Sequence, residues 1–217
     1  MFSLAQGHEK VTLGLLTLLL VFFFYGLKFQ FLIFFILVIF FLLSWHLFFF
    51  RDPDRKTINN PDLILAPADG KIYQIDRDNG IIRIRMSLFD VHITRVPISG
   101  NIVSITFDKG RNWPFISFLN RGTTENSRQI IQIKNSLGSF NIIQIVGIIA
   151  RYCRCYFEKG EEVQQGSRLG IIYYGSEVDI QFPSNKFDIL VREKQKTIAG
   201  MTPLARIKEK IEINNSR

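Results

Sequence analysis

Three polar side chains beyond the first sixty residues have the types needed to activate a hydroxyl group. Asp69 lies in a turn between a proline and a glycine, His92 lies in an apolar stretch, and Ser176 follows a glycine. An imidazole can take a proton from a serine hydroxyl while a carboxylate orients the imidazole, so the three could form a nucleophilic set. Asp90 is a second candidate carboxylate, because it would share a strand face with His92. Spacing alone is weak support, since a lone buried histidine is more often structural and Gly-Ser is common in turns.

The elements that must position these residues are mainly strands. From Pro61 onward, short alternations of apolar and polar residues are broken by Gly, Asn and Asp, which predicts a mostly β (α+β) fold. The expected strands are Ile72 to Ile75, Ile81 to Met86, Val91 to Val96, Ile102 to Phe107, Ile130 to Ile133, Phe140 to Ile149 and Leu169 to Tyr174. One short helix is expected, from Ala205 to Ile213.

The first fifty residues have a different composition from the rest. They hold 13 of the 21 Phe and only three charged side chains. Two apolar runs, residues 11–27 and 31–50, approach the ~20 residues that a helix needs to cross the hydrocarbon core. Only residues 28–30 separate the runs, so we expect a tight hairpin of two membrane helices. This excludes a purely soluble enzyme and a multispan transporter, and the second run is too long for a cleaved signal peptide.

The charges around the hairpin predict its orientation. Basic residues flank its two open ends at Lys10, Arg51, Arg55 and Lys56, whereas Lys28 alone lies at the turn. The positive-inside rule therefore places residues 51–217, as one catalytic β-rich domain, on the cytoplasmic side of the cell membrane. A re-entrant pair of helices that dips into one leaflet stays open, because the first run is short, and it gives the same placement.

The composition of residues 51–217 limits the partners of this domain. The segment carries a net charge of +7 but has no nucleic-acid-binding motif, so anionic lipid headgroups are the simpler partner and no nucleic acid is expected. Cys153 and Cys155 are too few for a disulfide framework or a zinc site. They fit inert strand cysteines in a reducing compartment, and no metal-ligand cluster is evident.

Strings around these residues occur in a specific order. They are FFFRDPDR (48–55), APADGK (66–71), MSLFDVH (86–92), VPISG (96–100), TEN (124–126), the segment 147–151 and GSEVDI (175–180), followed by Pro183. Their order and spacing resemble phosphatidylserine decarboxylase proenzymes, in the short bacterial and archaeal form. The resemblance covers about residues 48–183, and the N-terminal hairpin also matches.

The resemblance implies a self-cleaving proenzyme whose covalent cofactor, a pyruvoyl group, is made from Ser176. Ser176 would attack the carbonyl of Gly175, convert the peptide bond into an ester and then split the chain by β-elimination. The products would be residues 1–175, the beta chain, and residues 176–217, the alpha chain, which remain partners. Gly175 suits the attack because glycine adds no side-chain bulk and tolerates unusual backbone angles.

The same resemblance implies how the mature lyase would act in phospholipid biosynthesis. The pyruvoyl ketone would form a Schiff base with the amine of phosphatidylserine and accept the electrons freed when CO2 leaves, which gives phosphatidylethanolamine. His92, oriented by Asp69, would activate Ser176 during cleavage and later return a proton to the carbanion. No exogenous organic cofactor and no metal would be required.

Three positions bear on how closely the family pattern is followed. Longer bacterial relatives carry a second histidine where this chain has Arg95, as is usual in the short form. Glu177 follows the modified serine where the family commonly has Arg or Thr, so it could slow processing or alter substrate contacts. Arg151 is retained and could meet a phosphate or carboxylate, but a structural ion pair is an equal alternative.

Two other functions stay open from the sequence. The first keeps the chemistry and changes the lipid backbone, as in archaeal-type serine phospholipids. The second is a non-enzymatic, membrane-tethered β-domain resembling a lipoyl-type carrier or adaptor. A carrier needs an exposed lysine at a hairpin tip, and no Met-Lys or Lys-Met pair is present. The sequence does not determine the oligomeric state, and a homodimer stays open.

Overall fold

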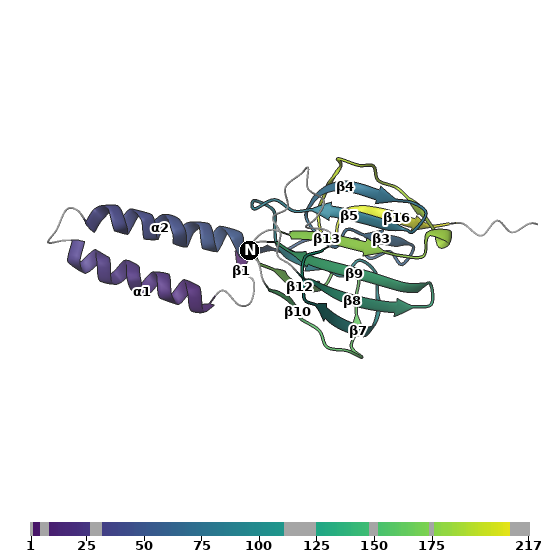
Figure 1. Ribbon diagram of the computed structural model, residues 1–217, viewed down its shortest axis with the longest axis horizontal. Helices are drawn as coiled ribbons and strands as arrows, with labels where there is room; N and C mark the ends of the chain where they lie inside the picture. Colours follow the sequence, from purple (N-terminus) through teal and green to yellow (C-terminus); the bar gives the residue numbers. More distant parts are fainter. Residues whose placement is uncertain are drawn as a thin grey trace, which may run out of the picture. The chain divides into compact units, whose positions relative to one another are not determined.

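A computed structural model describes residues 2–4, 9–26, 32–110, 125–147, 152–173 and 176–208 of the 217-residue chain. The chain divides into two compact units (Figure 1). The first contains residues 1–54 together with 89–91, and the second contains residues 55–88 and 92–217. We refer to them as the helical unit and the β unit.

The helical unit is built from two long apolar helices. Helix α1 spans Glu9–Gly26 and α2 spans Leu32–Phe49, so both predicted helices are confirmed within two residues at each end. The rings of Phe22 on α1 and Phe35 on α2 stack, with their centroids 5.7 Å apart. A short antiparallel pair, β1 (Phe2–Leu4) with β2 (Arg51–Pro53), brings the two ends of the unit together.

Large apolar side chains on both helices face outward. The exposed fraction is 68% for Phe24 and 66% for Phe34. A surface of this kind is unusual for a soluble protein and typical of membrane or protein contacts. Of the described helices, only α2 is long and apolar enough to cross a membrane, with a mean hydropathy of 2.7. The helices are therefore confirmed, whereas their insertion into a membrane stays a prediction.

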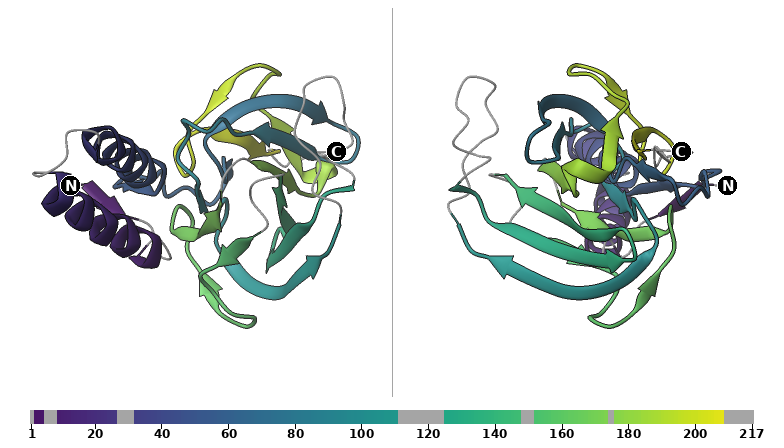
Figure 2. Two further views of the ribbon diagram at one scale, coloured as in Figure 1. Left: turned by 60° about the vertical axis from the view of Figure 1, so that its left-hand side comes forward. Right: turned by 90° about the vertical axis from the view of Figure 1, so that its right-hand side faces the viewer.

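The β unit is organised around one antiparallel sheet of eight strands, which curls strongly (Figure 2). In spatial order the strands are β11 (Glu162–Val163), β7 (Gly100–Asp108), β8 (Arg128–Asn135), β9 (Gly138–Val146), β13 (Ser176–Gln181), β5 (Ile81–Arg85), β4 (Gly70–Asp76) and β15 (Lys196–Thr197). Strand β13, whose first residue is Ser176, is thus an interior strand between β9 and β5.

Two three-stranded sheets accompany the large sheet in the described part of the β unit. One has the order β10 (Cys153–Cys155), β12 (Arg168–Ile172) and β6 (Ile93–Arg95), and the other has the order β14 (Phe187–Ile189), β16 (Pro203–Ile207) and β3 (Leu63–Leu65). A 3-10 turn at Ser184–Lys186 precedes β14. The alternate apolar positions of the strands converge on one core, to which Ile84, Ile142 and Val178 contribute. The β-rich fold class is confirmed.

Most expected strands are present, but two local predictions are wrong. The short helix expected from Ala205 is a strand as far as Ile207, because Ala205 pairs with β3 on one side and β14 on the other; residues 209–213 lie outside the described part. Asp90 lies in a bend before β6 begins at Ile93, so the strand-face relation between Asp90 and His92 does not apply.

Candidate functional site

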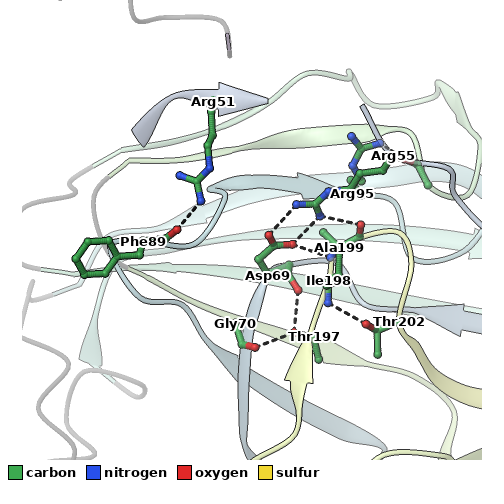
Figure 3. A network of polar contacts seen from close by, with 12 residues as sticks. Arg51, Arg55, Asp69, Gly70, Phe89, Arg95, Thr197, Ile198, Ala199 and Thr202 are labelled. Carbon is green, nitrogen blue, oxygen red and sulfur yellow. Dashed lines mark hydrogen bonds and ion pairs between the residues drawn. The ribbon is translucent and has the colours of Figure 1, made fainter. Parts of the chain in front are cut away.

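Asp69 lies in the bend just before β4, and its carboxylate is fully engaged (Figure 3). The two terminal nitrogens of Arg55 donate to its two oxygens at 2.6 and 2.7 Å. The backbone N–H of Ala199 donates to Oδ1 at 2.8 Å, and Arg55 also donates to the carbonyl of Ala199 at 2.9 Å. Bidentate pairs of this kind are among the strongest hydrogen-bonded contacts in proteins.

The Arg55–Asp69 pair is largely shielded from solvent. The side chains are 8% and 14% exposed, respectively. The hydroxyl of Thr197 donates to the carbonyl of Ala68 at 3.0 Å, which ties the loop around Ala199 to the same bend. The network therefore joins Arg55 and the bend at Asp69 to the loop at Ala199, which lies 130 residues after Asp69.

The backbone at Gly70 makes this bend possible. Its φ of 149° lies where side chains are disfavoured, and a Cβ there would lie 2.4 Å from the carbonyl oxygen of Arg85. The glycine thus lets β4 approach β5 directly after Asp69. This explains why a glycine follows Asp69 in the APADGK string (66–71).

His92 is buried immediately before β6. Its side chain is 1% exposed, and its Nε2 atom is shut off from solvent. The carbonyl of His92 accepts a hydrogen bond from the N–H of Ile172 at 3.1 Å, which extends the β6–β12 pairing by one residue. Both oxygens of Asp69 are held by Arg55, so the orientation of His92 by Asp69 stays a prediction.

Ser176 opens the interior strand β13, opposite Val146 of β9. Asn126, from the Thr-Glu-Asn string, is buried and donates from Nδ2 to the carbonyl of Val146 at 2.9 Å. That string therefore braces the strand position that faces Ser176. Gly175 and Arg151 lie outside the described residues, so the cleavage position and the role of Arg151 stay predictions.

Glu177 makes a buried ion pair that the sequence did not reveal. Its side chain is 0% exposed and lies 2.6 Å from a terminal nitrogen of Arg85. The hydroxyl of Tyr73 donates to the other carboxylate oxygen at 3.0 Å, and the Arg85 guanidinium lies 4.4 Å from the Tyr73 ring centroid. The unusual acid after Ser176 is therefore compensated by residues of β4 and β5.

Burial shifts the pKa of three further titratable groups. Burial raises the pKa of Asp179 to about 7, although Arg83 donates to it at 3.3 Å and opposes the shift. Burial likewise raises the pKa of Cys153 to about 12, and it raises that of Cys155. Both cysteines are free thiols on β10, as expected, and their raised pKa values keep them protonated and unreactive.

Comparison with known proteins identifies the family. The phosphatidylserine decarboxylase family model matches residues 42–205. A putative archaetidylserine decarboxylase proenzyme of Methanothermobacter thermautotrophicus is 37% identical over 191 residues, covering 78% of this chain and 84% of the relative. Phosphatidylserine decarboxylase proenzymes of Pelagibacter ubique and Wolbachia pipientis are 36% and 38% identical, over 75% and 74% of this chain and 80% and 74% of theirs. The chain belongs to the phosphatidylserine decarboxylase family.

Proposed function

We propose that the chain is a proenzyme that matures by self-cleavage into a lyase, which converts phosphatidylserine into phosphatidylethanolamine and CO2. The observation that carries this is the family match, because residues 42–205 include Asp69, His92 and Ser176. Relatives are named for both phosphatidylserine and archaetidylserine, so the serine headgroup is the chemistry they share. The family match also removes the support for a lipoyl-like adaptor.

Maturation requires Ser176 to act on its own peptide bond. Ser176 gives its hydroxyl proton to His92 and its Oγ attacks the carbonyl carbon of Gly175, so an ester replaces the peptide bond. Loss of the Cα proton of Ser176 then breaks the Cβ–O bond and releases residues 1–175 with a carboxylate at Gly175. The unsaturated residue left at position 176 becomes an imine, and water replaces its nitrogen, which leaves as ammonia.

The surroundings of position 176 fit the pyruvoyl group that this cleavage would leave. Because β13 is paired on both sides, its first residue would be fixed by the sheet after the chain is cut. By strand alternation, position 176 falls on the same face as Val178 and Ile180, which pack in the core. On that face the buried amide oxygen of Gln144 has no hydrogen-bond partner among the described residues. It is therefore one hydrogen-bond acceptor among apolar side chains.

The chain's own residues supply binding and proton transfer. A pyruvoyl keto group provides the electron sink for the pair freed when CO2 leaves an amino acid. His92, buried and shielded from water, is suited to hold a proton and return it to the substrate carbon. Glu177, paired with Arg85, keeps β13 joined to β5 across the proposed cut.

The helical unit supports a proposal of membrane anchoring. We propose that residues 1–50 hold residues 51–217 at the cytoplasmic face of the cell membrane, as a separate catalytic domain. The outward apolar side chains of α1 and α2 and the net charge of +7 on residues 51–217 support this. A lipid headgroup must reach the site while its acyl chains stay in the bilayer, so a site held at the interface suits the substrate.

Intact-mass measurement of the purified protein tests the proposal. We expect two fragments divided between residues 175 and 176, the smaller with a ketone-bearing N-terminus that reacts with a hydrazine probe. Ser176→Ala should give one chain of 25.2 kDa. A wild-type protein that decarboxylates phosphatidylserine while its chain is intact would contradict the pyruvoyl mechanism.

A further inference from the structure

Gln144 is a buried polar residue that the core does not fully satisfy. It lies on β9 with a 0% exposed side chain, and its Nε2 donates to the hydroxyl of Thr94 at 2.8 Å. Its Oε1 is also buried and has no hydrogen-bond partner within the described part of the chain. An unsatisfied buried amide oxygen is destabilising, so its presence needs a reason.

The strand register places Gln144 beside the reacting serine. Gln144 lies opposite Val178, and Ser176 lies opposite Val146. Position 176 is therefore the diagonal cross-strand neighbour of Gln144, a separation that a long side chain can span. Both positions fall on the core face of the sheet, by alternation with Ile142 and Ile180.

The partner of Gln144 lies beside the predicted base. Thr94 follows His92 by two residues and is 0% exposed, and residues two apart in an extended chain face the same side. The Gln144–Thr94 hydrogen bond thus connects the sheet that carries Ser176 with the strand that follows His92. It crosses from the eight-stranded sheet to β6 of a three-stranded sheet.

The neighbours of Gln144 do not account for its polarity. Ile142 and Val146 lie on either side along the same face of β9, and both are 0% exposed. A leucine or methionine at position 144 would fill a similar volume without an unsatisfied oxygen. The hydrogen bond to Thr94 accounts for the amide nitrogen of Gln144, but no described residue accounts for its amide oxygen.

We propose that Gln144 is a positioning residue for self-cleavage. Thr94 holds its Nε2 end, and its Oε1 accepts a hydrogen bond from the group that carries the proton, the serine hydroxyl or the imidazole. Gln144 thereby fixes the position of Ser176 relative to His92. This inference rests on the proposed function and goes beyond it by adding a residue pair to the maturation site.

The first experiment compares stability with the rate of cleavage in Gln144→Met, made in the full-length chain. The cleavage half-time, followed by gel electrophoresis after synthesis in a cell-free system, should lengthen at least tenfold. The melting temperature of the uncleaved form, made in a Ser176→Ala background, should change little, because the substitution removes the unsatisfied Oε1 but also takes the Nε2 donor away from the buried Thr94 hydroxyl. A structural role would instead lower the melting temperature.

Gln132→Met is the matched control. Gln132 lies on the neighbouring strand β8, is half-buried, and donates to Oδ1 of Asn141 at 3.2 Å on the other face of the sheet. It should cleave at the wild-type rate. If Gln144→Met also cleaves at that rate, or if it loses stability in proportion to its loss of rate, the proposal is wrong.

Thr94→Val tests the same hydrogen bond from its other side. Valine keeps the shape of threonine and removes the hydroxyl, so we expect slower cleavage. If Thr94 acts by holding Gln144, the double variant Thr94→Val/Gln144→Met should cleave within about twofold of the slower single variant, because the effects of one contact do not add. Multiplicative effects would overturn the proposal. Failure of the wild-type chain to cleave would instead contradict the proposed function.

Discussion

Arg55 holds both carboxylate oxygens of Asp69, with its two terminal nitrogens 2.6 and 2.7 Å away, in a pair that is largely shielded from water. Ala199 bridges the pair through its N–H and its carbonyl. If the chain is cut between residues 175 and 176, Arg55 and Asp69 belong to the large fragment and Ala199 to the small one. The predicted catalytic carboxylate is therefore also part of the contact between the fragments.

Asp69→Asn should affect both stability and maturation. The amide cannot balance the charge of Arg55, and removing one partner of a shielded pair costs about 3–5 kcal/mol when the other charge stays buried. We expect the free energy of unfolding, measured with urea in a Ser176→Ala background, to fall by an amount near the lower end of that range. Cleavage in the otherwise wild-type chain should slow greatly. Unchanged stability together with normal cleavage would exclude both roles.

Arg55→Lys separates the charge of Arg55 from its geometry. Lysine keeps the positive charge but cannot bind both carboxylate oxygens in the same planar arrangement. A smaller loss of stability than in Asp69→Asn is expected, with slower cleavage if the angle of the Asp69 carboxylate matters. Arg83→Lys, which alters the separate Arg83–Asp179 pair, is the control. Equal effects of the two lysine substitutions on cleavage would argue against a specific role for Arg55.

His92→Ala should block self-cleavage, because a serine hydroxyl is unreactive at its own pKa without a base. The full-length protein would then run as a single band of 25.2 kDa. Asp90→Ala is the comparison, since Asp90 was the second candidate carboxylate and should be dispensable. Normal processing of His92→Ala would move the base elsewhere, and Asp90 would be examined next.

The periodicity of the sequence predicted the long elements well. The apolar runs at residues 11–27 and 31–50 became α1 and α2, and the alternation around Ile81 and Ile102 became β5 and β7. These signals are local, because each element carries its own pattern. Three-residue strands such as β3 and β10 are too short for a period to stand out.

The contacts at the site could not be predicted in the same way. Arg85 and Glu177 are 92 residues apart in the sequence, and only the β5–β13 register brings them together. The charge pattern of the sequence places Arg55 among the basic residues that flank the hairpin, whereas in the fold its guanidinium binds Asp69. Such pairings depend on which strands become neighbours, and local patterns along the sequence do not reveal this.

Asp179 should make stability depend on pH in an unusual direction. Burial raises its pKa in the folded protein from 3.8 to about 7; Glu177 adds to the shift, and Arg83 and Arg128 oppose it. Between those values the folded state binds a proton that the unfolded state has lost, so stability falls as pH rises from about 4 to 7. Each unit corresponds to about 1.4 kcal/mol, which gives an upper limit on the order of 4 kcal/mol.

Asp179→Asn tests that slope. The asparagine does not ionise, so the fall in unfolding free energy between pH 4 and 7 should become smaller than in the wild-type sequence, measured by urea unfolding in a Ser176→Ala background. Above pH 7 the variant should be the more stable protein. Asp188→Asn, on β14 with an exposed side chain, serves as the control and should keep the wild-type slope. An identical slope in Asp179→Asn would mean that folding does not raise the pKa of Asp179.

The last prediction concerns the membrane. If residues 1–50 only anchor the enzyme, their deletion should leave the β unit able to fold and cleave itself, because Asp69, His92 and Ser176 all belong to the β unit. Turnover of phosphatidylserine in vesicles should then fall far more than turnover of a soluble short-chain analogue.

Anionic vesicles should partly restore the lost binding through the net charge of +7 on residues 51–217, at about 1 kcal/mol for each basic residue near the surface. Added salt should weaken that rescue, because it screens exposed charges. Both substrates should be compared for full-length and truncated protein at two salt concentrations, and equal losses on the two substrates would mean that the helices belong to the catalytic fold.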